Sequence, residues 1–337
     1  MNQEDPQDLQ EPVKQPVNHN IIGIDELHLS AKYRDYFKKI VSWVEDPNGK
    51  FGSRVQRKEM LDWLEGVRVN QLIGLSEQED ITDKMKQKGA KWDGVVHAFV
   101  QGCAGRMSPW IDIEHTKLPV ALRSITKKKI MLACEKQGRD YYYIDTGYFG
   151  NGKVKDYHRI TKNAMQWLGP TEDRPGDRWE RCGVKIKKMR SGSKILICPP
   201  SEKAMKYWNL DLGEWLESTI QQIKENTDRE IVIRTKQSRS VRVNTDTMEM
   251  ALSQDIHCLV TFNSIAAVEG LINGKPVFTM GPNAAQPLAN TDLTKIETPF
   301  CPDKDQVHHL MCCLAYHQFT VQEMNSGFAW AVINGQA

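Results

Sequence analysis

The clearest pattern of hydrophobic and polar positions lies in the last third of the chain. Residues 256–262 form an apolar run with the length of a buried strand, and Asn263 and Ser264, two residue types common at helix N-termini, follow it at once. Apolar residues then recur three and four positions apart until Gly274, a typical helix stop, and residues 277–280 form a second apolar run. The pattern predicts a strand–helix–strand unit, which builds a parallel sheet with a right-handed crossover.

The same alternation extends to both sides of this unit. Earlier in the second half, the pattern predicts strands at 194–198 and 230–234 and helices at 212–226 and 245–253. In the first half, apolar runs predict strands at 93–100, 129–134 and 141–144, preceded by helices at 30–45, 57–66 and 78–88. Strands that alternate with helices indicate the α/β class, so we expect two α/β domains with a helical N-terminal extension.

The irregular stretch 150–181 marks the boundary between the domains, because it mixes glycine, proline, charged and aromatic residues without a period. We therefore divide the chain into a disordered arm (1–19), an N-terminal α/β domain with its helical extension (20–155), an interdomain segment (156–181), a C-terminal α/β domain (182–302) and C-terminal helices that pack back on the first domain (303–337). A chain of 337 residues suits two domains of about 150 residues each.

Composition narrows the class of protein and its compartment. No apolar run reaches the roughly 18 residues of a membrane helix, and the polar N-terminus lacks the pattern of a signal peptide. The eight cysteines form no CxxC pair, which favours reduced thiols in a cytoplasmic protein without a membrane partner. The net charge is only +2, but residues 123–129, 181–194 and 234–242 are locally basic. Such runs are either solvated faces or parts of a phosphate-binding groove, and the sequence leaves both open.

Polar and charged residues gather where two strands of the second domain are predicted to end. One strand delivers Arg234 and Lys236, and its neighbour ends at Asn263 and Ser264. In parallel sheets, ligands bind beyond the carboxyl ends of the strands, where a helix start presents free N–H groups to an anion. Glu269, further along the predicted helix, would accept hydrogen bonds from sugar hydroxyls. The alternative is that Asn263 and Ser264 only cap the helix and that Glu269 is solvated.

The first half offers further candidates. Gly102 and Gly105 follow the predicted strand 93–100 and would let a ligand approach closely, although an ordinary tight turn has the same pattern. An aromatic and basic cluster lies just after the domain boundary: Tyr157, His158, Arg159 and Lys162. This cluster suits base stacking and phosphate contact, although such residues often only pack two domains together.

The C-terminal tail holds a spacing that is typical of metal ligands. In the sequence HHxxCC, His308 and Cys312 share one face of a helix, as do His309 and Cys313. Two ligands do not make a closed site, and no other Cys-His cluster in the sequence completes it. We therefore expect packed thiols, surface imidazoles and no metal.

With these residues identified, residues 93–330 resemble glycosyltransferases of the GT-B type. More narrowly, the chain is similar to a group of tailed-phage proteins regarded as glycosyltransferases, some thought to add sugars to hydroxymethylated bases in phage DNA, and more distantly it resembles capsule-polysaccharide transferases. The matching segments are YHRITKNA (157–164), DRWERCGVKIKKMRSGSKILIC (177–198), TDREIVIRTK (227–236), NSIAAVEGLINGKPVF (263–278), PLANTDLTKIETP (287–299) and AYHQFTVQEMNSGFAW (315–330). The first 90 residues are not covered.

The resemblance implies two Rossmann-like domains that face each other across a cleft, and a nucleotide-sugar as co-substrate rather than a tightly bound cofactor. It implies that Arg234 and Lys236 contact the donor phosphates, that the turn at residues 263–264 binds the phosphate or leaving group, and that Glu269 binds hydroxyls. Relatives often have Arg-Pro-His-Pro or Arg-Pro-Lys-Pro where this chain has Arg-Thr-Lys-Gln at 234–237. The role of that histidine, if the reaction needs it, is either taken by Lys236 or missing. Whether a divalent metal takes part stays open.

The first domain of such an enzyme holds the acceptor and, in an inverting reaction, a catalytic base. For that base we favour Asp145, at the end of the strand 141–144, over Asp112, Glu114 and His115. The resemblance thus implies transfer of a hexose or pentose to a hydroxymethylated pyrimidine in DNA, flipped out of the duplex or in a single strand. Two alternatives remain: a glycan or small-molecule acceptor, and an inactive GT-B-like module that only binds nucleic acid.

Overall fold

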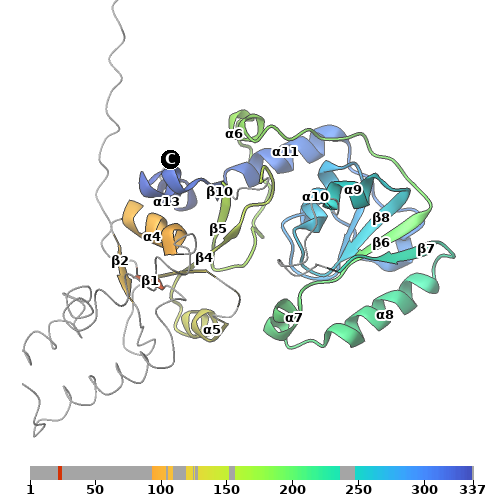
Figure 1. Cartoon of the computed structure of the whole chain (residues 1–337), viewed down its shortest axis with the longest axis horizontal. Helices are drawn as coiled ribbons and strands as arrows, with labels where there is room; N and C mark the ends of the chain where they lie inside the picture. Colours follow the sequence, from red (N-terminus) through yellow and green to blue (C-terminus); the bar gives the residue numbers. More distant parts are fainter. Residues whose placement is uncertain are drawn as a thin grey trace, which may run out of the picture.

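The computed structural model (Figure 1) describes residues 22–24, 93–103, 105–108, 119–123, 125, 128–151, 156–235 and 247–335. The helices predicted at 30–45, 57–66 and 78–88 lie outside these residues, as do Lys236, Asp112, Glu114 and His115. The described chain forms two α/β domains, each built on one largely parallel sheet. The predicted fold class is therefore confirmed.

The first sheet has six strands in the order β10-β5-β4-β3-β1-β2. The strands are β1 (Ile22–Ile24), β2 (Arg106–Ser108), β3 (Val120–Arg123), β4 (Tyr141–Thr146), β5 (His158–Lys162) and β10 (Gln318–Phe319). β1 to β4 run parallel, whereas β5 lies antiparallel to both β4 and β10. Helix α4 (Asp93–Gly102) packs on one face through Phe99, and α5 (Lys128–Lys136) covers the other through Met131 and Cys134.

The second sheet has four parallel strands in the order β7-β6-β8-β9. They are β6 (Lys194–Cys198), β7 (Glu230–Ile233), β8 (Ile256–Thr261) and β9 (Val277–Thr279), joined by α7 (Glu202–Trp208), α8 (Leu212–Lys224), α9 (Met248–Ser253) and α10 (Ala266–Ile272). Helix α8 covers the face that carries Ile197 and Val260, while α9, α10 and α11 (Lys304–Ala315) cover the face that carries Leu196 and Leu259. Because both faces are covered, every residue of β8 is buried.

The two sheets share one strand order. In each, the first strand in the chain lies between the second and the third, and the fourth follows the third. In such an order the chain continues from the first strand toward one edge of the sheet and from the third strand toward the other edge. This reversal opens a crevice at the carboxyl ends of those two strands. In the second sheet this point lies between β6 and β8, because α8 and α10 cover opposite faces.

Two predicted strands of the first domain are helices. Residues 93–100 belong to α4 and residues 129–134 to α5. In α5 the buried residues are Met131 and Cys134, three positions apart as on one helix face, while Leu132 between them is 44% exposed. In α4 the buried residues include Val96, Phe99 and Val100, which have the same helical spacing, but the apolar residues beside them hid this pattern in the sequence. The predicted strands at 141–144, 194–198, 230–234, 256–262 and 277–280 and the helices at 212–226 and 245–253 are confirmed.

The C-terminal segment returns to the first domain. After α11, β10 pairs with β5, and α12 (Val321–Asn325) and α13 (Phe328–Ile333) pack on α4. Gly102 allows this contact, because a Cβ atom there would lie 1.8 Å from the Met324 carbonyl oxygen. The prediction that Gly102 opens a strand end to a ligand is therefore wrong, since the missing side chain makes room for α12.

Arg178, in helix α6 (Asp177–Arg181), connects the interdomain segment to this returning chain. The side chain is only 4% exposed and forms an ion pair with Glu323 (Nη1–Oε1 2.5 Å). Its remaining donors reach the carbonyl oxygens of Ala315 (2.9 Å) and Gln318 (2.7 Å). Glu323 also accepts a hydrogen bond from the Thr320 N–H, so the same carboxylate fixes the start of α12. The buried charge is thus paired, and each of its three nitrogens donates a hydrogen bond, as the burial of a charge requires.

We expect Arg178→Ala to lower the free energy of unfolding by roughly 3–5 kcal/mol, because removing one partner leaves the other charge uncompensated. Arg181→Ala is the matched control, since Arg181 lies in the same helix with its side chain 59% exposed. It should change stability by no more than about 0.5 kcal/mol. Urea denaturation of the three proteins measures both, and equal losses in the two variants would contradict the central role of Arg178.

Candidate active site

Cys198 and Arg234 lie at the carboxyl ends of β6 and β7, and Glu269 lies in α10, which follows β8. Cys198, the last residue of β6, is 4% exposed, and burial raises its pKa to about 12. The charge of Arg234 lowers the pKa of this thiol and the charge of Glu269 raises it. Arg234 directly follows β7 and Glu269 lies in α10, which follows β8, so both lie on the side where the strand order reverses, and their contact with a ligand stays a prediction.

The turn after β8 presents polar groups at the same edge of the sheet. The Ser264 hydroxyl accepts a hydrogen bond from the Ala266 N–H (3.2 Å), but the N-cap of α10 is Ile265, so the predicted capping by Asn263 or Ser264 is wrong by one residue. Among the described residues, the side-chain amide of Asn263 and the N–H groups of residues 263–265 have no hydrogen-bond partner. Since α10 has only seven residues, the helix alone attracts an anion weakly, and Arg234 supplies the larger positive charge.

The carboxyl ends of the second sheet point toward the first domain (Figure 1). There, at the end of β4, Asp145 forms an ion pair with Arg159 (2.9 Å) and accepts hydrogen bonds from the Tyr143 hydroxyl (3.2 Å) and the Thr146 N–H (2.7 Å). Burial raises the pKa of Asp145, but Arg159, the Thr146 N–H and Arg123 together hold it below its ordinary value. The carboxylate is therefore ionised at neutral pH, with 38% of its side-chain surface exposed.

A turn after β5 joins the two sides. Asn163 adopts a positive φ of 57°, which folds the chain back so that the Met165 carbonyl oxygen accepts a bond from Arg159 Nε (3.1 Å). The next residue, Gln166, donates to the carbonyl oxygen of Asn263 and accepts from the Ala284 N–H (3.2 Å). Sequence analysis missed Gln166, because a single glutamine between Met165 and an aromatic residue carries no periodic signal.

The expected acceptor cluster divides in the structure. His158 and Arg159 are buried, with exposed fractions of 4% and 6%, and the Arg159 guanidinium is taken up by Asp145, Thr146 and Met165. Neither side chain is placed to contact the phosphate of an acceptor. Lys162 pairs with Asp140 (2.8 Å), and the register of β4 with β5 places it at the opposite end of the sheet from Asp145.

Tyr157 and Gly105 are the remaining acceptor candidates. Tyr157 is half-buried and packs on the backbone at Gly147 and Gly150, beside the end of β4. Gly105 follows α4 rather than a strand, and its N–H bonds the Val100 carbonyl oxygen (2.7 Å), as in an ordinary helix-terminal turn. No observation tests a ligand contact for either residue.

The histidine and cysteine cluster of the tail lies on α11. Cys312 and Cys313 are buried, as expected for packed thiols, and the Cys312 sulfur lies 3.6 Å from His308 Nε2. All eight cysteines are free. Within the described ranges, no group of three or more His, Cys, Asp or Glu side chains is placed to hold a metal ion. In the same part of the chain, no helix has the length and apolar content to cross a bilayer.

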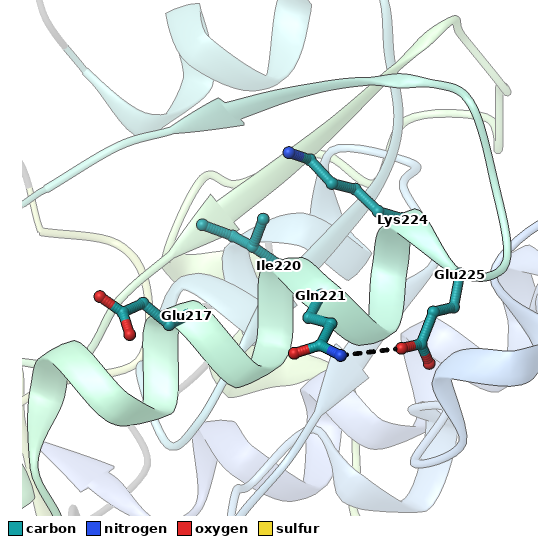
Figure 2. A pocket seen from close by; sticks show the side chains of 5 residues that line it. All are labelled: Glu217, Ile220, Gln221, Lys224 and Glu225. Carbon is teal, nitrogen blue, oxygen red and sulfur yellow. Dashed lines mark hydrogen bonds between the residues drawn. The ribbon is translucent and has the colours of Figure 1, made fainter.

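An open groove lies along α8 (Figure 2). It is lined by Glu217, Ile220, Gln221, Lys224 and Glu225. Its charges are of both signs, and Gln221 is already bonded to Glu225 (3.1 Å). The groove offers no convergent set of groups for a ligand.

No family model and no curated protein matches the sequence. Two solved structures that match are KpsC proteins of Thermosulfurimonas dismutans. One is described as a beta Kdo 2,4 transferase, with 14% identity and a TM-score of 0.39 over 66% of this chain and 87% of that chain. The other is described as a beta Kdo 2,7 transferase, with 13% identity and a TM-score of 0.39 over 74% and 98%. At these values the similarity decides neither the fold nor the function.

We expect Arg159→Met to raise the pKa of Asp145, because burial raises this pKa and the positive charge of Arg159 is the main influence that lowers it. In the native protein the lowered pKa means that the ion pair stabilises the fold above the ordinary pKa of the carboxyl and that this stability is lost as pH falls through the folded value. The difference in unfolding free energy between the two proteins should therefore be constant from about pH 8 to 6 and narrow below about pH 5. Urea denaturation across pH measures it, and a constant difference down to about pH 3 would contradict the pairing.

Proposed function

We propose that this protein is a glycosyltransferase that moves a sugar from a nucleotide-sugar donor to an acceptor hydroxyl. The observation that carries the proposal is the placement of Arg234 directly after β7 and of the 263–265 turn directly after β8, at the strand-order reversal of the second sheet, with Glu269 in the helix that follows. This is the position where open α/β sheets bind nucleotides. The sequence resemblance to GT-B enzymes over residues 93–330 supports the same assignment.

The donor groups have complementary roles. Arg234 would bind the donor phosphate through charge-assisted hydrogen bonds, joined by Lys236 from the same segment, and the Asn263 amide would bind a phosphate oxygen. As the sugar–phosphate bond breaks, negative charge grows on the leaving phosphate, and these fixed donors stabilise it more strongly in the transition state than in the ground state. Glu269 would accept hydrogen bonds from sugar or ribose hydroxyls.

Asp145 would act on the acceptor from the first domain. Its ionised carboxylate can accept a hydrogen bond from the acceptor hydroxyl and take the proton as the new bond to the anomeric carbon forms. A low pKa makes it a weak general base, so much of its contribution would come from orienting the hydroxyl. Arg159 keeps it charged and in place.

Arg234→Ala and Glu269→Ala should each weaken binding of the nucleotide-sugar. Loss of a charge-assisted hydrogen bond costs about 1.5–3 kcal/mol, or roughly ten- to a hundredfold in affinity. Arg190→Ala is a matched control, because Arg190 is an exposed arginine of the second domain away from the strand ends. Calorimetry with the donor that the wild type hydrolyses, chosen from a panel of nucleotide-sugars, measures the effect. Unchanged affinity in both variants, with the fold intact, would contradict the site, whereas hydrolysis of any donor would exclude an inactive binding module.

The finer proposal, that the acceptor is a hydroxymethylated pyrimidine base in DNA, is supported by the sequence resemblance alone. The burial of Arg159 and the pairing of Lys162 remove two of the expected phosphate contacts. Phosphate contacts to DNA would then have to come from other cations, such as Arg234 or the exposed lysines of α5. A glycan or small-molecule acceptor remains the alternative.

If DNA is the acceptor, its dissociation constant should rise by at least about tenfold between roughly 50 and 200 mM salt, because bound phosphates release counterions. Fluorescence anisotropy with single-stranded hydroxymethylpyrimidine DNA measures this, and an uncharged oligosaccharide is the control that should show little salt dependence. Lys162→Ala should leave the DNA affinity unchanged, since that side chain lies at the far end of the sheet. The absence of binding at low salt would rule out DNA as the acceptor.

A further inference from the structure

Gln166 makes a hydrogen-bonded contact between the two domains at the candidate site. Its side chain is 6% exposed and comes from the first-domain turn that follows β5. The Ala284 N–H can only donate, so it fixes the amide oxygen of Gln166, and the amide nitrogen must then face the Asn263 carbonyl oxygen. Both halves of this amide are therefore committed to the second domain.

We propose that Gln166 is a positioning residue that holds the turn after β8 in its donor-binding geometry. In a trans peptide the carbonyl oxygen and the next N–H point in opposite directions. Holding the Asn263 carbonyl toward Gln166 therefore aims the unpartnered Ser264 N–H away from it. The next peptide is held in the same way, because Asn283, which is fully buried, donates to the Ser264 carbonyl oxygen (2.9 Å). We call the two hydrogen bonds of the Gln166 amide, to Asn263 and from Ala284, the clamp. The ligand in this inference rests on the proposed function, but the clamp does not.

The clamp also couples the donor side to the acceptor side. Arg159, the partner of Asp145, bonds the carbonyl oxygen of Met165, and the adjacent residue Gln166 bonds the turn at Asn263. The adjacent residues Met165 and Gln166 thus connect the Asp145 carboxylate of the first domain, through Arg159, to the turn at Asn263 in the second domain. Gln166 sets the orientation of the turn without itself touching the donor.

Gln166→Met tests the clamp, because methionine has a similar volume and flexibility but neither donates to Asn263 nor accepts from Ala284. We expect the amides of Ala266 and Ala267, which are bonded to Ser264, to exchange with deuterium at least about fivefold faster, since the opening of a local turn controls their protection. Exchange in β6 should not change. Gln222→Met on α8 is the matched control, since Gln222 is exposed and its side chain bonds only Ser218 within the described chain.

The consequence for the donor is measured separately. Gln166→Met should raise the dissociation constant of the nucleotide-sugar by about five- to tenfold, the value of about one net hydrogen bond. Gln166→Glu keeps the hydrogen bond from the Ala284 N–H but loses the one to the Asn263 carbonyl oxygen, so it should also weaken binding of the nucleotide-sugar. This loss should persist at high salt, whereas a loss caused only by the added negative charge would disappear there. KM for the donor should rise more than kcat falls.

The outcomes separate the two proposals. Faster exchange at residues 266–267 together with weaker donor binding supports the inference. Unchanged exchange would overturn the clamp, and faster exchange with unchanged donor affinity would overturn its role in positioning. Faster exchange in a protein whose wild type binds no nucleotide-sugar would overturn the proposed function and leave only a structural clamp.

Discussion

The buried guanidinium of Arg178 is the interaction on which the arrangement of the two domains depends. A buried charge is tolerated only when it is paired and hydrogen-bonded, and the acceptors for Arg178 come from three places in the returning chain: the end of α11, β10 and α12. The rings of Tyr316, Phe319 and Phe328 lie within 5.4 Å of its central carbon. Because α11 covers the second sheet and α12 packs on α4, fixing this segment also fixes one domain against the other.

The candidate site is shared between elements that are individually simple. Arg234 follows β7 and Glu269 lies in α10 of the second domain, Asp145 lies near the end of β4 in the first, and the turn carrying Gln166 contacts both domains. A reaction that separates charge benefits from groups held rigidly before the substrate arrives, since they need not reorganise as charge develops. Among the described residues, the hydrogen bonds of Arg159 to Asp145 and of Gln166 to Asn263 hold these groups in place.

How much the sequence predicts depends on how local the signal is. The second domain was predicted nearly in full, because β8 and β9 are continuous apolar runs flanked by polar turns, and α8 has a clear helical period. In the first domain α4 was mistaken for a strand, because eight residues with few polar positions suit either structure. β1 was missed, since three residues carry too little pattern.

The site followed the same rule. The placement of Arg234 directly after β7 was predictable because strand ends are predictable, and parallel strands meet at one edge. The ion pair of Asp145 with Arg159 and the contact of Gln166 with Asn263 were not, because partners 14 and 97 positions apart are set by tertiary packing. Arg159 is a basic residue in a stretch without a regular pattern, which suggested a phosphate ligand. The side chain is instead buried and stabilises the fold.

The strand order of the first sheet has a consequence for how the chain is made. This sheet contains β1 near residue 22 and β10 near residue 319, whereas all four strands of the second sheet lie between residues 194 and 279. On the ribosome, the strands of the second sheet emerge together and can pair at once, while β5 must wait for β10. The domain that begins first in the chain is therefore the last to be completed during synthesis.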